Sequence, residues 1–130
     1  MPSIEHICYL VGFFDGDGCI TTAPTKSFRI GIANTDKKVL NKLKRRFGGY
    51  INVSYVPTNK NHNMAWKWII TKRVDVLKTL KMIEPHLIIK KKQARIVIKY
   101  LDDIKPERYD KLKIKLRNLK SDKHYFRGGE

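Results

Sequence analysis

The residues with the clearest chemical potential lie in one short stretch, residues 10–18. Gly12 and Gly16 are four positions apart on one helical face, and small residues at that spacing let two helix backbones approach closely. Asp17 follows just past the expected end of the helix. If two copies of this helix pack side by side, two Asp17 carboxylates meet near a symmetry axis and repel each other unless they bind cations. Hard divalent cations such as Mg²⁺ accept carboxylate and phosphate oxygens, and paired metals can hydrolyse phosphodiesters.

The elements around this stretch must position it, and their patterns predict the order α-β-β-α-β-β-α-α-α. Ser3 is a suitable N-cap for the first helix, which should end in the glycine-rich turn at residues 15–18. Alternating apolar residues predict strands at about 20–24, 28–34, 50–56 and 66–70. Helical spacing predicts helices at about 36–47, from Asp75 to Pro85, at 94–101 and in the tail after Pro106. We therefore expect an α+β fold.

The net charge of the chain indicates the class of partner. The chain has 28 Lys and Arg against 12 Asp and Glu, a net charge of +16. A compact chain with that excess repels itself, and nucleic acid is the polyanion that most often relieves it. The cations are spread along the whole chain, which argues against a membrane surface, and no apolar run could span a bilayer. Ribosomal and other basic RNA-binding proteins share this composition, so charge alone indicates no activity.

The two cysteines, Cys8 and Cys19, lack the paired spacing of a zinc site and are too few for a disulfide framework. The N-terminus has neither the basic start nor the apolar core of a signal peptide. We expect an intracellular protein, in the compartment that holds its target genome, whether bacterial, phage, archaeal or organellar.

Residues 10–18 resemble the LAGLIDADG motif of homing endonucleases, with matches at Gly12, Asp15, Gly16, Asp17 and Gly18. The strand-strand-helix-strand-strand order and the segments 34–36 and 85–94 are also similar to that family. The resemblance covers about residues 4–101, so we expect one endonuclease domain over 1–101 and a basic helical tail, 102–130, packed on it or extending it. A single motif is typical of the branch whose members act as homodimers.

The resemblance implies specific roles. It implies a four-stranded antiparallel, saddle-shaped sheet backed by helices. Asp17 becomes a metal ligand, assisted by the main-chain carbonyl of Gly16, with Mg²⁺ as the cofactor and Mn²⁺ or Ca²⁺ able to replace it in binding. Lys90 takes the position near the scissile phosphate, and Asp36 a water-ordering position. Asp15 is assigned mainly to the helix end. The expected dimer interface consists of Leu10, Gly12, Phe13 and Gly16.

Strand alternation predicts the face that would lie in the DNA major groove. Residues of this face, with those at its ends, should contact bases, whereas flanking cations should neutralise phosphates. The predicted base-contacting residues are Thr21, Ala23, Thr25, Arg29, Gly31, Ala33, Asn34, Tyr50, Asn52, Ser54, Lys67, Ile69 and Thr71. The predicted phosphate contacts are Lys26, Lys60, Lys72 and Arg73.

The predicted function is a site-specific homing endonuclease that makes metal-dependent double-strand breaks in a long, roughly palindromic duplex. Two alternatives stay open on the same fold: an RNA-binding intron maturase and a non-catalytic DNA-binding regulator. Simpler explanations also exist for single residues. The motif helix could be an ordinary core helix, residues 90–92 a solvated basic surface, Asp36 a first-turn acid, and any outward strand residue plain solvated surface.

Overall fold

The computed structural model describes residues 2–55 and 64–128. The predicted order of elements is confirmed. In chain order the elements are α1 (Ile4–Asp17), β1 (Gly18–Ala23), β2 (Ser27–Asn34), α2 (Lys37–Phe47), β3 (Tyr50–Tyr55), β4 (Ala65–Ile70), α3 (Arg73–Ile83), the short turn η1 (Glu84–His86), α4 (Lys91–Asp102), the short turn η2 (Pro106–Arg108) and α5 (Tyr109–Gly128). The third helix therefore begins at Arg73, two residues before the predicted Asp75.

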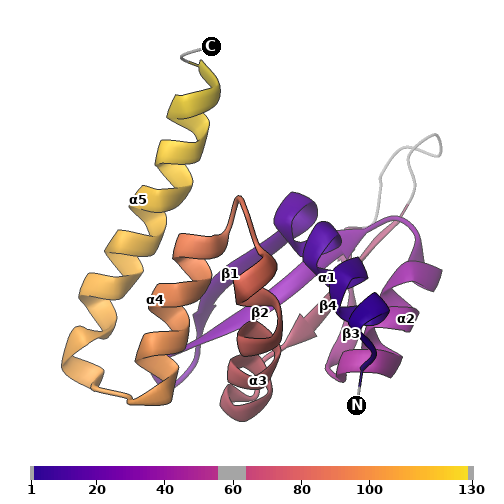
Figure 1. Cartoon of the computed structure of the whole chain (residues 1–130), viewed down its shortest axis with the longest axis horizontal. Helices are drawn as coiled ribbons and strands as arrows, with labels where there is room; N and C mark the ends of the chain where they lie inside the picture. The colour runs from indigo at the N-terminus through magenta and orange to yellow at the C-terminus, as the bar shows by residue number, and fades with distance from the viewer. Residues whose placement is uncertain (1, 56–63, 129–130) are drawn as a thin grey trace.

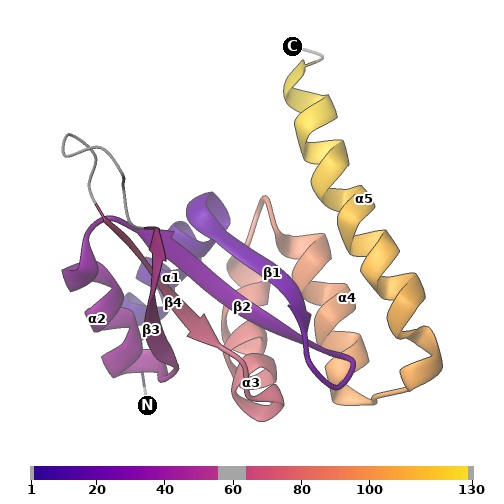
Figure 2. The ribbon, with the colours of Figure 1, turned by 180° about the vertical axis from the view of Figure 1, so that it is seen from behind.

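The four strands form one antiparallel sheet in the order β1-β2-β4-β3. Figure 1 shows α1 and α3 in front of this sheet, and Figure 2, from behind, shows the opposite face without a helix across it. The α+β fold with a helix-backed antiparallel sheet is thus confirmed, and it has one covered and one open face.

The covered face holds the core that strand alternation predicted. Phe28, Ile30 and Ile32 of β2 are all buried, as is Trp68 of β4. The Trp68 indole Nε1 donates a hydrogen bond of 2.8 Å to the main-chain carbonyl of Gly48, which satisfies the one polar atom of that buried ring. Every core residue of β2 is thus two positions from the next, so the residues between them point to the open face.

The tail helix α5 lies along α4 (Figure 2). Tyr109 and Leu116 of α5 are buried in the same core cluster as the sheet. Lys120 Nζ donates a 2.7 Å hydrogen bond to the Ile20 carbonyl. Partial burial lowers the pKa of Lys120 below its ordinary value, despite the neighbouring Cys19. The Lys120 side chain therefore occupies one carbonyl group of the edge strand β1, which could otherwise pair with another chain.

The β1–β2 turn is locally strained. Thr25 and Lys26 have φ angles of 61° and 54°, which side chains other than glycine seldom adopt. They lie in the three-residue turn between the paired residues Ala23 and Ser27, and asparagine and glycine are the residues that adopt positive φ angles most readily. The turn is held to α4 because the Tyr100 hydroxyl donates to the Lys26 carbonyl at 2.7 Å.

Replacing this pair by Thr25→Asn with Lys26→Gly should raise the free energy of unfolding by about 1–2 kcal/mol, since it removes the cost of two left-handed residues. Chemical denaturation measures the change. Thr22→Asn, in the exposed part of β1, is the matched control and should bring no gain. Equal or lower stability of the double variant would show that the turn is not strained.

Candidate active site

The candidate site begins where α1 passes directly into β1. Gly18 closes the helix, and its N–H donates to the Phe14 carbonyl. A side chain at Gly18 would collide with the ring of Phe14, so only glycine allows this close approach. Asp17 is the last residue of α1 and is exposed. The junction therefore places its carboxylate in solvent at one end of the sheet.

Asp15, two residues before Asp17, is buried, and its carboxylate accepts hydrogen bonds from a turn that is distant in sequence. Its Oδ2 accepts the N–H of Ile88 at 2.7 Å, and its Oδ1 accepts the N–H groups of Ile89 and Lys90 at 3.0 and 2.9 Å. The next helix, α4, starts at Lys91, and its N-cap residue, Lys90, makes no capping hydrogen bond through its side chain. The Asp15 carboxylate therefore satisfies N–H groups ahead of α4 and places negative charge at the positive end of that helix.

Lys90 completes a reciprocal contact. Its side chain is only 6 % exposed, and Nζ donates to the main-chain carbonyl of Asp15 at 2.8 Å. An ammonium at the C-terminal end of α1 is favourable for the dipole of that helix. The cations at the start of α4 thus have compensating groups inside the chain, so their position alone does not require a bound phosphate. Sequence reasoning missed this role of Asp15, although the absence of a capping side chain at Lys90, just before α4, signals that the cap comes from elsewhere in the chain.

Asp36 has a structural role that the sequence left as an alternative. Its Oδ1 accepts the N–H of Lys38 at 3.0 Å and caps α2, and its own N–H donates to Asn34 Oδ1 at 2.7 Å. Because Gly18 pairs with Ile32, the end of β2 lies at the same end of the sheet as the start of β1. Asp36 therefore lies toward the Asp17 end, and a water-ordering role for it stays a prediction.

The strand register places the outward residues in rows across the open face. Cys19, Gly31, Ile69 and Tyr50 form one row, and Ala33, Lys67 and Asn52 form the next. A Cβ on Gly31 would lie 2.8 Å from Lys67 Cε, so the lysine stem crosses the space that the glycine leaves. Ile69, in the same row as Gly31, is only 8 % exposed, although it faces away from the core.

The other predicted DNA contacts are distributed around this face. Arg29 Nε donates to Thr21 Oγ1 at 3.2 Å, and Ala23 pairs with Ser27 beside them. Ser54 lies at a register shift between Val53 and Tyr55, where alternation no longer fixes the direction of a side chain. Thr71 is half-buried, whereas Thr25, Lys26, Lys72 and Arg73 are exposed. Lys60 lies outside the described residues.

The predicted dimer interface needs one revision. Leu10 is fully buried, four residues before the equally buried Phe14, so its side chain belongs to the core of its own chain. Gly12 and Gly16 lie on the other side of α1, and a Cβ built on either would meet no atom within 4 Å. Phe13 is half-buried between these sides and contacts the ring of Tyr9. The open stripe of α1 is therefore a glycine stripe without Leu10.

The donor set at the end of α1 fits a hard divalent cation. Asp17 supplies a carboxylate, and the carbonyl groups in the last turn of a helix have no partner within it, which leaves Gly16 able to supply a second oxygen. The described residues contain no group of three or more His, Cys, Asp and Glu that could hold a metal. With the Asp15 carboxylate engaged by three N–H groups, one chain offers one acid at this point.

Comparison with known proteins identifies the family. Residues 5–84, more than half of the chain, match the model of the LAGLIDADG-like domain, so the chain belongs to that family. No curated protein matches the sequence. Within the described part of the chain, none of the helices combines the length and apolar content needed to cross a membrane.

Solved structures share the fold at low identity. The homing endonuclease I-CvuI, in complex with the I-CreI target, is 19 % identical with a TM-score of 0.65, over 87 % of this chain and 80 % of that one. The archaeal intron-encoded homing endonuclease I-Vdi141I, complexed with DNA, is 17 % identical with a TM-score of 0.69, over 87 % and 82 %. I-LtrWI, bound to target DNA, is 18 % identical with a TM-score of 0.60, over 91 % of this chain but 45 % of that one.

Loss of charge should affect stability strongly at Asp15 and hardly at all at Asp17. Asp15→Asn keeps the shape but turns an amide NH₂ toward N–H donors, so the free energy of unfolding should fall by about 2–4 kcal/mol. Asp17→Asn, at an exposed position, should change it by no more than about 0.5 kcal/mol. Urea denaturation of the two variants measures both values, and equal effects would contradict the division of roles.

Proposed function

We propose that this chain is one subunit of a homodimeric, metal-dependent endonuclease that cuts both strands of a long, roughly palindromic DNA duplex. The observation that carries the proposal is the exposed Asp17 carboxylate at the end of a helix whose glycine stripe is open. A second copy packed on that stripe would bring two such acids to one place. Two adjacent carboxylates require cations, and that arrangement suits phosphodiester hydrolysis.

Asp17 and the main-chain carbonyl of Gly16 would hold the metal, with Mg²⁺ the proposed ion. The bound metal would activate water and stabilise the leaving oxygen of the phosphodiester. Lys90 would add positive charge beside the same helix end, where a phosphate would lie. Support for divalent metal comes from I-CvuI, whose crystal structures include a complex with the I-CreI target in 2 mM Mg, in which the DNA is not cleaved, and a complex with its own target in 2 mM Ca.

The open face of the sheet is the proposed DNA-binding surface. It presents Arg29, Asn52 and Lys67 among small residues, a mixture suited to guanine, adenine and thymine methyl contacts. Exposed cations at its ends, such as Lys26 and Arg73, suit the phosphate backbone. The relatives that share the fold include complexes with target DNA, which favours the same use of this face.

The relatives that share the fold differ in length. This chain spans 80 % of I-CvuI but only 45 % of I-LtrWI, although most of it aligns in both cases. A relative of about twice the length has room for a second equivalent unit in one polypeptide. In the proposed arrangement, another copy of this chain supplies that second unit.

The catalytic proposal is tested by Asp17→Asn. A cleavage selection from a randomised duplex library with Mg²⁺ first yields a target for the wild-type chain. On that target the variant should cut at least about 1,000-fold more slowly, because one ligand charge is lost from each subunit, while its Kd for the duplex stays within about threefold. Unchanged cutting by the variant would refute the assignment, and binding without any wild-type cutting would favour the regulator or the maturase.

The assembly proposal is tested by Gly12→Ala. In the isolated chain the added methyl meets open space and removes a helical glycine, so the free energy of unfolding should rise by about 0.5–1 kcal/mol. In the dimer the same methyl would separate the two backbones and weaken self-association at least about tenfold. Denaturation at low concentration and sedimentation at high concentration measure the two effects, and unchanged association would contradict packing on this stripe.

A further inference from the structure

The tail residue Lys120 carries its ammonium group to the edge of the sheet. Its Nζ donates a 2.7 Å hydrogen bond to the main-chain carbonyl of Ile20 in the edge strand β1. The Ile20 side chain is fully buried, so its neighbours in the strand, Cys19 and Thr21, point to the open face. An ammonium group has three N–H donors, and the described residues supply Lys120 with this one acceptor. A positive charge therefore lies at the edge of the open face with donors left for a ligand.

Lys67 approaches the same place from within the sheet. It pairs with Ala33 of β2, but a Cβ on Gly31 would lie 2.8 Å from its Cε. The lysine stem therefore leads from β4 across β2 toward Cys19, which pairs with Gly31. Burial lowers the pKa of Lys120 below its ordinary value, and the positive charge of Lys67 adds to that lowering, against the effect of Cys19. The two ammonium groups are thus close enough to repel each other.

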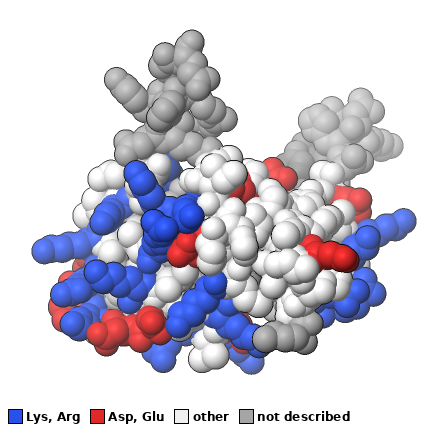
Figure 3. Space-filling view, viewed as in Figure 1, with Lys and Arg blue, Asp and Glu red and all other residues white. Residues whose placement is uncertain are grey.

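The strands offer no acid that would offset this repulsion. Among the described residues, the four strands contain two cations, Arg29 and Lys67, and no Asp or Glu. The helical side is different, since Figure 3 shows acidic groups interspersed with Lys and Arg there. An anion that bound between Lys67 and Lys120 would replace their repulsion by two attractive contacts. The charge pattern therefore favours an anionic ligand on the open face, beside β1.

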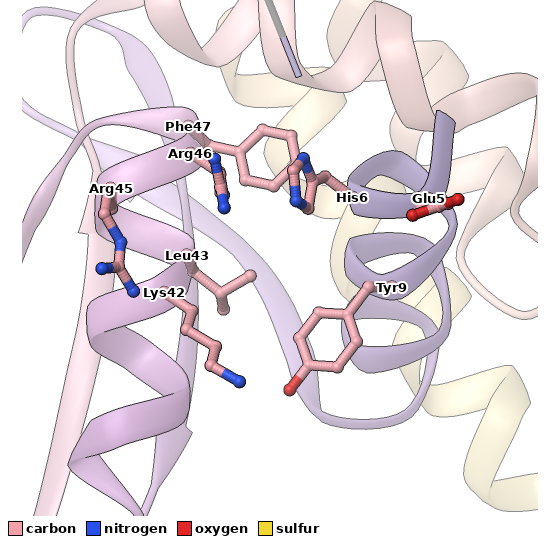
Figure 4. Close-up of a pocket in the computed structure, with 8 residues that line it drawn as sticks. All are labelled: Glu5, His6, Tyr9, Lys42, Leu43, Arg45, Arg46 and Phe47. Carbon is pink, nitrogen blue, oxygen red and sulfur yellow. The ribbon is translucent and has the colours of Figure 1, made fainter. Parts of the chain in front are cut away.

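The basic residues of α2 provide a contrast. Lys42, Arg45 and Arg46 line a hollow of about 320 Å³ between α1 and α2. In Figure 4 they lie across the hollow from α1, whose Glu5 and His6 belong to the same lining. The hollow lies between helices that cover the sheet, so its cations are on the far side from the open face. Lys42 is therefore a suitable comparison for a lysine that faces a duplex.

The width of the sheet determines what its edge would meet on DNA. Neighbouring strands are about 4.8 Å apart, so four strands span about 14 Å, whereas the major groove is about 12 Å wide. A sheet whose strands follow the groove therefore brings its edge strands against the two phosphate backbones that border it. Because β1 is an edge strand, the ammonium group of Lys120 would face a phosphate and not a base.

We infer that Lys120 and Lys67 together bind one phosphate of the DNA backbone beside β1, in an inference that rests on the proposed DNA-binding function. The tail helix α5 thereby belongs to the DNA-binding surface, although it lies outside the sheet. Lys67 contacts the backbone in place of a base, so it fixes the register of the duplex and reads no sequence. The shared phosphate relieves the repulsion that the two lysines carry in the free protein.

The role of the tail is tested by Lys120→Gln, which removes the charge. The probe is one duplex recovered from a randomised library by selection for binding without divalent metal, so no result depends on cutting. The variant should raise the Kd for this duplex at least about tenfold. The slope of log affinity against log salt concentration should fall by about 1–2, because one phosphate contact is lost from each of two subunits. Lys120→Arg keeps the charge, and its Kd should stay within about threefold of wild type.

Two controls remove the general effect of net charge. Lys111→Gln makes the same change at an exposed position of α5, about two and a half turns earlier and so on the opposite side of the helix. Lys42→Gln makes it at the α1–α2 hollow. Neither should change the salt slope by more than about 0.5. If Lys120 only held α5 on β1, its loss would lower the free energy of unfolding and weaken binding equally at every salt concentration. A salt slope for Lys120→Gln equal to those of the controls would overturn the inference.

Sharing of the phosphate is tested by combining variants. Lys67→Gln alone should weaken binding at least about tenfold, by a similar factor on duplexes of different sequence. Because one phosphate contact can be lost only once, Lys120→Gln should cost at least about fivefold less in the Lys67→Gln background than in wild type. Factors that simply multiply would show two separate contacts and contradict the shared site.

These outcomes are distinct from those of the catalytic test. If the salt slopes change as expected but no duplex is cut, the proposed nuclease activity fails and the phosphate site stands. If the wild-type chain cuts its target but Lys120→Gln binds like Lys111→Gln, the phosphate site alone fails. If the wild-type chain binds no duplex at all, both proposals fail.

Discussion

The carboxylate of Asp15 joins the end of α1 to the turn before α4. The Asp15 carboxylate accepts hydrogen bonds from three N–H groups of the turn before α4, and the Asp15 main-chain carbonyl accepts one from the Lys90 ammonium. These hydrogen bonds join segments that are more than 70 residues apart in sequence. A buried acid is costly unless its oxygens are hydrogen-bonded, and here three donors offset that cost. The contact also matches both helix dipoles, with an anion at the start of α4 and a cation at the end of α1. The positions of Lys90, the 88–89 turn and the end of α1 all follow from it.

The parts of the fold that the sequence predicted are those that depend on burial of one side of an element. Period-2 alternation in β2 and helical spacing in α2 follow from contact with a single core, so strand faces and helix order could be read without knowing any partner. The sequence could single out Asp17 as a candidate for a similar reason, since a glycine-flanked acid at a helix end has a local signature. The role of Asp15 was not found, because its partners lie 73 to 75 residues away and no periodicity encodes them. Leu10 was misplaced because residues 10, 12 and 13 are sequence neighbours that lie on different sides of one helix.

Alternation along the strands also predicted which side chains point to the open face, but it did not predict how accessible each of them is. Gly31 leaves a space that the Lys67 stem enters, and Ile69 in the same row is only 8 % exposed. At Ser54 a register shift breaks the period altogether. Which outward side chains can reach a ligand therefore depends on cross-strand neighbours, which the register supplies and the linear pattern does not.

The adjacent acids of the motif can serve different purposes because of helix geometry. Two residues along an α-helix correspond to about 200° of rotation, so Asp15 and Asp17 project to nearly opposite sides. The first therefore meets the backbone of its own chain and becomes a structural anchor, whereas the second is left in solvent, where only an ion or another molecule can neutralise it. Gly12 and Gly16 are likewise turned away from the core, because a Cβ built on either would meet no atom within 4 Å in the isolated chain. The helix α1 is therefore fixed to its own core on one side, and its glycines leave the other side open to the close approach of another backbone.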